Sequence, residues 1–525
     1  MPLKDKLIVS YLLFTTRGRI DRLTYWTASI FIWTTFYVLF QLLELLFSYT
    51  ATWFIYPPLF WALFATATKR LHDSNKSGHW LWLIFLPVFG PLFLIYVLGF
   101  KKGEANSNRF GAIPNSAPDY FKNPEAEKIP HLKTEERIIN DVTQLNPIIV
   151  SQVATPKTTE DLQDIIRTTS KPICVGGGRF SMGGQTASPN SLHIDMRQLN
   201  KVLAFSAANK TIKVQAGIRW CDIQHYIDGH NLSIKIMQTY ANFTVGGSLS
   251  VNCHGRYIGL GPLILSVISL DVILANGEII HTSPNEQPEI FYACVGCYNA
   301  VAIITNVELA LTENILVKRS HTKMLRDAYK QFFFNTIRDN QEVILHNADI
   351  YPPSYKHVRA VSWKTTTERP TDNTRLMPLA AAYPIERYFI GAFSKSKFGK
   401  WRREFIIDPL VFWRKKIHWR NYEAGYDVLE LEPKSRKDTT YVLQEYFVPT
   451  ENFDAFAALM AEIFIRHNVN VINVSIRHAN ADSGSLLAWA KEEVFAFVVW
   501  YKQGTSETNK NQVAVWTREL IDAAQ

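Results

Sequence analysis

The sequence predicts an α-helical transmembrane module of about three helices, followed by two α+β domains. Three long apolar stretches without a charged residue lie within the first 100 residues. Beyond residue 130, short apolar runs typical of strands alternate with helical patterns and glycine-rich turns. A chain of 525 residues also exceeds one ordinary hydrophobic core, so several domains are expected. Hydrophobic residues form 47% of the chain, which excludes a mainly disordered protein.

The three apolar stretches cover residues 23–43, 45–68 and 77–100. A hydrocarbon core of about 30 Å needs about 20 apolar residues in a helix, so each stretch is long enough to cross a bilayer. The first stretch is too long for a signal peptide and no small-residue cleavage site follows it, so we expect it to stay in the mature protein. Buried helices of a soluble core are the alternative, but these are seldom so long or flanked by Trp and Tyr.

Basic residues flank the apolar stretches. Residues 1–112 contain eleven Lys or Arg against five Asp or Glu, a large part of the net charge of +9. Basic flanks retain loops in the cytoplasm, so a membrane explains this charge better than a nucleic-acid partner does. Three crossings would place the following domains outside, whereas Lys101 and Lys102 favour the inside. A bend at Pro87, Gly90 and Pro91 into a re-entrant hairpin would reconcile the two.

Short motifs in this region have the spacing of a known family. They are Gly18-Arg19-Ile20 with Arg22, Tyr25 and Trp26, then Lys69-Arg70-Leu71-His72-Asp73, Ser77-Gly78, and Asn108-Arg109-Phe110-Gly111. Over residues 14–111 the sequence resembles the bacterial inner-membrane family known as domain of unknown function 805. The resemblance implies a multi-pass module of the inner membrane without assigned chemistry. His72 and Asp73 are interpreted as an ion site or, more simply, as a lipid headgroup contact.

The prolines and mixed charges of residues 113–130 are typical of a linker. The membrane module then covers residues 1–112, a second domain 131–312 and a third 313–525. Five cysteines form neither a disulfide framework nor a paired zinc spacing, so no metal site is predicted. Cys294 and Cys297 form one CxxC pair, which we interpret as incidental.

A glycine-rich loop opens the second domain. Residues 176–185, GGGRFSMGGQ, follow a predicted strand and contain five glycines. Glycine permits positive φ and close approach of the backbone, so successive amides can converge on a pyrophosphate. Arg179 can add charge-assisted hydrogen bonds. Taken alone, such a loop is explained equally well as a structural turn.

A second glycine loop makes the pattern specific. Residues 245–255, VGGSLSVNCHG, lie downstream, and Ile303-Ile304-Thr305 is expected to end a further apolar strand. The order of these segments over residues 140–312 resembles the vanillyl-alcohol-oxidase flavoproteins with a PCMH-type FAD-binding domain, specifically their sugar and aldonolactone oxidase branch. The resemblance implies two α+β subdomains that hold FAD between them.

The resemblance also implies which residues contact FAD. The first loop would hold the pyrophosphate, and Ile304 would offer backbone groups to adenine. The implied contacts are Gly176, Gly177, Gly178, Arg179, Phe180, Ser181, Met182, Gly183, Gly184, Gln185, Asp195, Gly217, Thr244, Gly246, Gly247, Ser250, Asn252, His254 and Ile304. Many members carry in the first loop a histidine bonded covalently to the flavin, where Arg179 and Phe180 stand here. This predicts non-covalent FAD, as in the similar decaprenylphosphoryl-ribose oxidase group, which acts at membranes on a lipid-linked sugar.

The third domain is expected to be an α+β substrate (cap) domain. Apolar alternating runs such as 471–477 and 494–501 indicate strands between helices. Hydride transfer from a sugar carbon to flavin N5 requires a deprotonated or polarised hydroxyl, so a basic or cationic side chain near the ring is expected. Relatives continue further than Gln525, so we expect this domain to be truncated at its C-terminus.

Arg477 and His478 stand where the relatives place an ionic residue that faces the flavin, and both are predicted catalytic residues. Arg477 is the first choice because strand alternation puts it on one face with Asn473 and Ser475. An Arg at an exposed sheet edge is the structural alternative. Glu445 and Tyr446 are secondary candidates.

Residues 393–420 combine nine Lys or Arg with two acidic residues and interleaved aromatic side chains. This pattern indicates an amphipathic segment at anionic lipid headgroups, where a lipid-linked substrate would arrive. A solvated helix with one core-facing stripe is the alternative. The adjoining residues 420–423 are a candidate cofactor or substrate contact.

Together these observations predict a membrane-anchored, FAD-dependent oxidoreductase that acts on CH–OH groups, similar to D-arabinono-1,4-lactone oxidases. Its substrate would be a secondary alcohol of a sugar, an aldonolactone or a lipid-linked sugar, and its electron acceptor oxygen or a membrane quinone. We expect membrane lipids as partners, no nucleic acid, and the flavin domain on the cytoplasmic face. The alternative is a non-catalytic membrane protein with a degenerate FAD-binding module.

Overall fold

The computed structural model describes residues 13–46, 49–104, 108–110, 137–378, 396–426, 435–482 and 484–525. The chain divides into two compact units, one built mainly from residues 1–118 and the other from most of residues 119–525. Each unit is described by itself. The predicted linker, 113–130, lies outside the described residues. So do residues 393–395, which begin the predicted amphipathic segment 393–420, and Gly111, the last residue of the motif that starts at Asn108.

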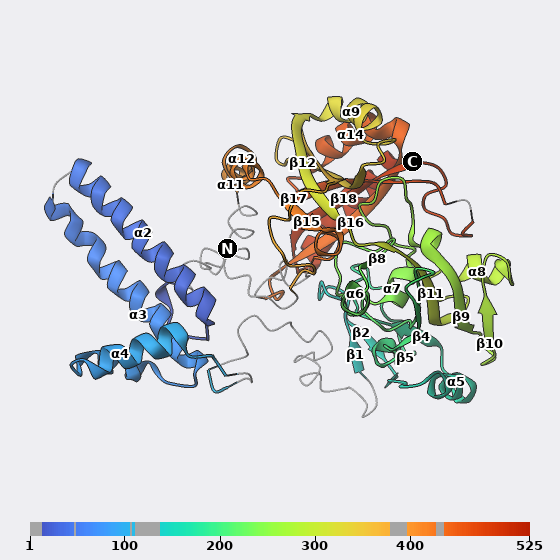
Figure 1. Ribbon diagram of the computed structural model, residues 1–525, viewed down its shortest axis with the longest axis horizontal. Coiled ribbons are helices and arrows are strands. Elements are labelled where there is room, and N and C mark those ends of the chain that lie inside the picture. The colour runs from blue at the N-terminus through green and yellow to red at the C-terminus, as the bar shows by residue number, and fades with distance from the viewer. Residues whose placement is uncertain are drawn as a thin grey trace. The chain divides into compact units, whose positions relative to one another are not determined.

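The first unit is helical. It contains α2 (Arg22–Leu46), the 3₁₀ helix η2 (Tyr49–Ile55), α3 (Tyr56–Asp73), the 3₁₀ helix η3 (Gly78–Phe85) and α4 (Phe89–Ile95), which continues as a π-helical turn, η4 (Tyr96–Phe100) (Figure 1). The third predicted stretch is broken, because Val88 adopts a positive φ of 65° between η3 and α4. The bend expected at Pro87 is therefore present.

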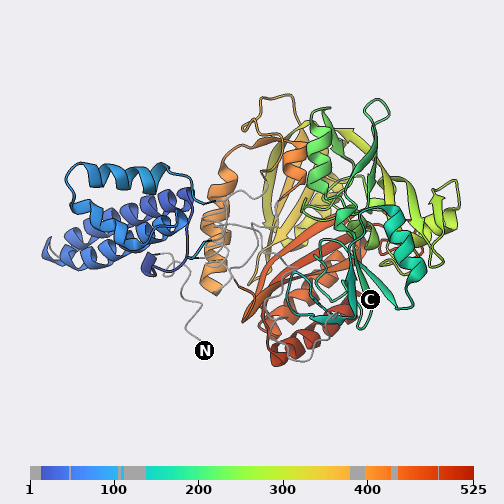
Figure 2. The same ribbon diagram turned by 90° about the horizontal axis from the view of Figure 1, so that it is seen from below.

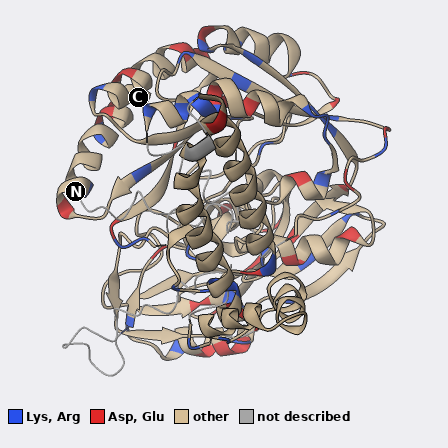
Figure 3. Cartoon of the chain, turned by 90° about the vertical axis from the view of Figure 1, so that its left-hand side faces the viewer, with Lys and Arg blue, Asp and Glu red and all other residues tan. Residues whose placement is uncertain are grey.

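Among the described residues, one helix, α2, is long and apolar enough to cross a membrane, and a shorter apolar helix covers Phe89–Phe100. Figure 3 shows α2 and α3 uncharged along most of their length. Many large apolar side chains of α2 are exposed, among them Ile30, Tyr37 and Leu45. Side chains of this kind in such number are typical of a surface that lies in lipid or against another protein. The prediction of about three transmembrane helices stays a prediction.

The family motifs of the first unit meet at one end of its helices. Asp73 forms salt bridges with Arg19 at 3.0 Å and with Arg70 at 2.7 Å, and all three side chains are buried. His72 Nδ1 lies 3.0 Å from the Gly18 carbonyl oxygen, and its ring stacks on Phe110. The motif residues therefore bind one another, and the Asp73 carboxylate is already neutralised by two guanidinium groups.

The second unit begins with two small sheets. β1 (Arg137–Ile139) and β2 (Ile148–Val150) pair antiparallel, and β3 (Gln152–Ala154), β5 (Leu192–Asp195) and β4 (Ile173–Gly176) pair in parallel in that order. The helix α5 (Thr159–Thr168) precedes β4. It begins with a capping box in which Thr158 and Asp161 exchange hydrogen bonds with each other's backbone.

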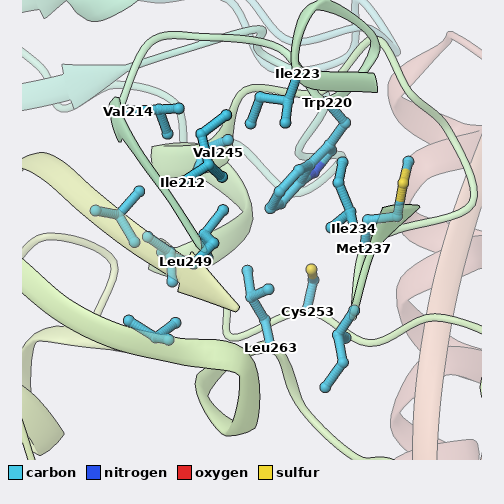
Figure 4. Packing of buried hydrophobic residues seen from close by; sticks show 14 of the residues in the cluster. Ile212, Val214, Trp220, Ile223, Ile234, Met237, Val245, Leu249, Cys253 and Leu263 are labelled. Carbon is cyan, nitrogen blue, oxygen red and sulfur yellow. The ribbon is translucent and has the colours of Figure 1, made fainter. Parts of the chain in front are cut away.

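A larger antiparallel sheet follows. Its order is β10 (Ile279–Thr282), β9 (Val267–Ile273), β11 (Ile303–Glu313), β7 (Thr211–Gln215) and β6 (Val202–Ser206), with β8 (Leu232–Ile234) paired to the far end of β11. The helices α6 (Trp220–Asp228), α7 (Val245–Ser250) and α8 (Pro288–Cys294) accompany it. Trp220 is fully buried in the core that this sheet shares with α6 and α7 (Figure 4). The segment Ile303-Ile304-Thr305 begins β11, and the expectation that it ends a strand is wrong.

The remainder of the unit is a seven-stranded antiparallel sheet with helices, as expected for the third domain. Its order is β15 (Ile417–Trp419), β12 (Leu316–Leu325), β14 (His357–Thr365), β13 (Val343–Ile350), β17 (Val471–Ala479), β18 (Val494–Gly504) and β16 (Thr439–Pro449). α9 (Tyr329–Thr336), α14 (Phe453–Arg466) and α15 (Glu507–Ala524) share a core with the sheet (Figure 2). The helices α11 (Lys397–Arg402) and α12 (Asp408–Trp413), joined by the π-helical turn η9 (Arg403–Ile407), and α13 (Arg420–Ala424) complete the unit.

Candidate FAD site and catalytic cluster

The first glycine loop begins where β4 ends. A Cβ atom added to Gly176 would lie 2.5 Å from His193 Cε1 of β5, and one added to Gly177 would overlap the hydroxyl group of Thr244. The loop backbone therefore lies directly against both elements, at a distance that only glycine allows. Within the loop, Arg179 and Gly184 have positive φ values of 59° and 80°.

The second glycine loop lies next to the first. Thr244 precedes α7, and the first amides of this short helix donate to the segment after β7: Val245 N to Ile218 O at 2.9 Å and Gly246 N to Ala216 O at 2.7 Å. Three segments that are far apart in sequence thus converge around the glycines at 176–178 and 246–247. The resulting cradle consists of backbone that carries almost no side-chain bulk, as a pyrophosphate site requires.

The larger side chains of the first loop hold the loop in place. Arg179 is buried, with Nη2 3.3 Å from His193 Nε2, and Phe180 packs on Phe243. Gln185 Oε1 accepts from Gly183 N at 2.9 Å, and the Met182 sulfur accepts from Leu443 N of β16 at 3.1 Å. The side chains therefore fasten the loop internally, to β5 and to the sheet of the third domain.

Two of the remaining predicted contacts shape the surrounding backbone. Asp195 accepts from Arg197 N at 3.1 Å and forms a salt bridge with the Arg197 side chain at 2.8 Å. Gly217 lies against the same turn, because a Cβ atom there would overlap the Met196 carbonyl oxygen. Both residues position the segments beside the cradle.

Asn252 and Ser250 are occupied by other protein groups. The Asn252 side chain donates to Asp482 Oδ2 at 2.9 Å and accepts from Ile264 N at 3.0 Å, and Asn252 has a positive φ of 45°. Ser250 Oγ donates to the Gly247 carbonyl oxygen at 2.8 Å. Their predicted role as side-chain contacts to FAD gains no support from this geometry, which gives them a structural role.

Ile304 lies near the start of β11, where a β-bulge separates Ile304 from Asn306. Its side chain is buried in the core, so only its backbone is available to a ligand. The next residue, Thr305, accepts from Ala216 N at 2.8 Å. β11 is thus joined to the segment that also receives the first amides of α7.

An ionic cluster of the buried His254, the half-buried Arg477 and the solvent-accessible Glu445 lies where the second glycine loop meets the seven-stranded sheet. His254 Nε2 lies 3.2 Å from Glu445 Oε2. Glu445 and Ser475 are both paired with Val498 of β18, so they share one face of the sheet, and Arg477 lies on that face two residues beyond Ser475. The strand alternation predicted for Asn473, Ser475 and Arg477 agrees with the burial pattern of β17.

The charges of this cluster depend on one another. Burial lowers the pKa of Arg477, and the nearby Glu445 carboxylate partly restores it. Burial opposes ionisation of Glu445, but His254 and Arg477 outweigh it and hold the pKa of this carboxyl below its usual value. Arg477 Nε is buried without a hydrogen-bond partner among the described residues. Such a cation is available to a ligand.

His478 is not part of this cluster. As the next residue on β17 it points to the opposite face, where its Nε2 lies 2.6 Å from Glu493 Oε1 and its ring contacts Phe333. This face belongs to the hydrophobic core of the third domain. The geometry therefore separates the two predicted catalytic residues and leaves Arg477 as the candidate.

A second buried ion pair was not predicted from the sequence. Arg256 Nη1 lies 3.1 Å from Glu423 Oε1, and Tyr426 donates to the same carboxylate at 2.9 Å. Arg420 donates to the Lys235 carbonyl oxygen at 2.9 Å, so the candidate contact at 420–423 is engaged in joining the domains. The partners lie 167 residues apart in sequence, and no local pattern connects them. Within the described residues there is no cluster of metal-binding side chains.

Comparison with known proteins assigns families to two parts of the chain. Residues 150–283 match a family described as an FAD binding domain, and residues 13–112 match a family described as a protein of unknown function, DUF805. The first match contains both glycine loops. The second contains the converging motifs of the helical unit.

Several curated proteins are similar to part of the chain. Cytokinin dehydrogenase 3 of Arabidopsis thaliana is 26% identical over 263 residues, 48% of this chain and 49% of that protein. L-gulonolactone oxidase of Bos taurus is 26% identical over 217 residues, 38% of this chain and 49% of that protein. A putative D-arabinono-1,4-lactone oxidase of Neurospora crassa is 26% identical over 155 residues, 29% of this chain and 28% of that protein. The chain spans about half the length of the first relatives it matches.

Proposed function

Since the chain contains a PCMH-type FAD-binding domain and a DUF805 domain, FAD is its cofactor, and we propose that it is a membrane-anchored oxidoreductase acting on a secondary alcohol of a sugar or aldonolactone. The observation that carries this proposal is the cluster of His254, Glu445 and Arg477, which joins the second glycine loop to the sheet of the third domain. Two of the similar proteins are lactone oxidases, which supports this substrate class.

The residues of the cradle fit a non-covalently bound dinucleotide. Gly176, Gly177 and Gly246 let the segments of the cradle approach one another closely, because a side chain at any of the three would overlap a neighbouring residue. Arg179 occupies the loop position at which a covalent histidine is expected in relatives. His193 lies against Gly176, and its two ring nitrogens lie within hydrogen-bond distance of Cys174 Sγ and Arg179 Nη2. We therefore propose that FAD is held without a covalent bond.

The ionic cluster would prepare the substrate. Bound FAD supplies a hydride acceptor for the carbon that carries the hydroxyl group. The Arg477 guanidinium would bind and polarise the hydroxyl oxygen. The ionised Glu445 carboxylate, which also contacts His254 Nε2, would accept the hydroxyl proton as the hydride leaves the carbon. Ser475, on the same strand face, would bind a neighbouring hydroxyl group of a sugar.

The helical unit would provide the anchor. α2 has the length and composition of a membrane span, and the break between η3 and α4 suits a re-entrant segment. A lipid-linked sugar as substrate, a quinone or oxygen as acceptor, three membrane helices and a cytoplasmic flavin domain are parts of this proposal. The experiment below tests whether the protein binds FAD and whether a substrate reduces it.

The test uses the full chain purified in detergent. We expect flavin absorbance that is released into the supernatant by acid, and bleaching of that absorbance under anaerobic conditions by an aldonolactone or a polyprenyl-phosphate sugar. Arg477→Ala should retain FAD and lose bleaching by about 100-fold or more in rate, because it removes a cation that acts on the reacting oxygen. The matched control is Lys502→Ala, a change on the neighbouring strand β18. A wild-type protein that holds FAD and is bleached by none of these substrates would instead support the non-catalytic alternative.

A further inference from the structure

The strongest unassigned feature of the second unit is the helical segment 397–413, formed by α11, η9 and α12, which we name the surface helix. Its exposed face carries seven large apolar side chains: Phe398, Trp401, Phe405, Ile406, Leu410, Val411 and Trp413. Trp413 is 82% exposed and Phe398 67%. A soluble monomer rarely presents a continuous apolar patch of this kind unless a partner or a membrane covers it.

The surface helix is fixed to the sheet and does not depend on the apolar face for attachment. Arg319 donates to the carbonyl oxygens of Val411 and Arg414, each at 2.9 Å. His321 Nε2 lies 3.0 Å from the Phe412 carbonyl oxygen, and Arg403 donates to Ile472 O at 2.9 Å. These bonds attach the helix to β12 and β17, so the fold fixes which face of the helix is exposed.

The charges of the helix are sorted by face. Its two acidic residues point inward, where Glu404 binds Lys323 at 2.9 Å and Asp408 accepts from Tyr351 at 2.7 Å. Lys397 and Arg414, at the two ends, are exposed. Outward charge is therefore positive, beside an aromatic and aliphatic surface, and this combination is complementary to anionic lipid headgroups above an acyl layer.

We propose that the surface helix lies in the headgroup region of an anionic lipid bilayer, with its apolar face directed to the acyl chains. A bilayer is the occupant that the structure favours, because the same chain carries a helical unit with a membrane-compatible helix. The Arg403 side chain also donates to Asn473 Oδ1 at 3.1 Å. The membrane-facing helix is thus bonded to the strand that carries Arg477, and the substrate face of the sheet would open near the lipid surface.

The test measures lipid contact at one residue of the full chain. An environment-sensitive fluorescent amino acid replaces Leu410, 64% exposed on the surface helix, and in a control protein Ile465, 60% exposed on α14. Each protein is reconstituted at low density into phosphatidylcholine vesicles with and without phosphatidylglycerol. Brominated lipids should quench the probe at position 410, more strongly with phosphatidylglycerol, and leave the probe at position 465 unchanged.

Charge reversal provides the second readout. Lys397→Glu combined with Arg414→Glu should abolish the phosphatidylglycerol dependence, whereas Lys157→Glu combined with Lys171→Glu, at other exposed positions, should preserve it. Equal quenching at positions 410 and 465 would overturn the proposal. So would a blue-shifted, unquenched probe at 410, which would mean that protein covers the helix. None of these readouts requires FAD or turnover, so failure here is distinguishable from failure of the proposed oxidoreductase.

Discussion

At the scale of single residues, Gly177 of the first loop has no room for a side chain. Gly177→Ala would place a methyl group on the Thr244 hydroxyl, so the two glycine segments would have to separate. We expect FAD affinity to fall at least about tenfold, measured by flavin fluorescence titration of the apoprotein. Gly229→Ala is the matched control because nothing lies within 4 Å of its added Cβ atom. Equal affinities for the two variants would contradict this assignment of the loop.

His193 gives the cofactor site a dependence on pH. Burial, with repulsion from Arg179, lowers its pKa to about 3, so the folded protein keeps it neutral where the unfolded chain protonates it near pH 6.5. Stability should therefore decrease as pH falls below about 6.5 and continue to decrease toward 3, by about 1 kcal/mol per pH unit for this group. Urea denaturation of His193→Gln should show a shallower decrease than the wild type. The exposed His230→Gln should retain the wild-type slope, and a wild-type slope in His193→Gln would refute the explanation.

At the scale of elements, the buried charges at the end of α3 hold the helical unit together. Asp73→Ala would leave Arg19 and Arg70 buried without their carboxylate. We expect a loss of about 3 kcal/mol, because removing one partner of a buried ion pair leaves an uncompensated charge. Thermal unfolding in detergent checks this, with Glu44→Ala, an exposed change on α2, as control. Unchanged melting of Asp73→Ala would show that the cluster is not buried in the protein as it occurs in detergent.

The sequence predicted elements more successfully than it predicted side-chain partners. The strands β17 and β18 and the break at Pro87 follow from local patterns, which act over a few residues. The sequence placed Ile303 to Thr305 at the end of a strand, whereas they begin β11. An apolar run indicates that a strand is present but does not show where the strand starts and ends. His478 was chosen with Arg477 although adjacent strand residues face opposite sides. The pair formed by Arg256 and Glu423 depends on contacts between distant segments, which one sequence does not reveal.

At the scale of the whole molecule, the two units are expected to respond differently to the cofactor. Both glycine loops and the Arg477 cluster lie within the second unit. FAD at 100 times its dissociation constant should stabilise that unit by about 2.7 kcal/mol and leave the helical unit unchanged. Scanning calorimetry in detergent, with and without added FAD, should therefore shift one transition only. A common shift of all transitions would show that the units unfold together.

The hydrogen bond from Leu443 N to the Met182 sulfur bears on how the protein avoids aggregation. β16 is the last strand of the seven-stranded sheet, and β18 occupies only one of its two sides. On this strand, Leu443 N is covered by the cofactor loop and Thr440 Oγ1 donates to the Thr143 carbonyl oxygen. An uncovered edge strand invites pairing with a second chain. The first glycine loop therefore also shields this edge strand from pairing with a second chain, and loss of order in the loop would reduce solubility as well as the proposed cofactor binding.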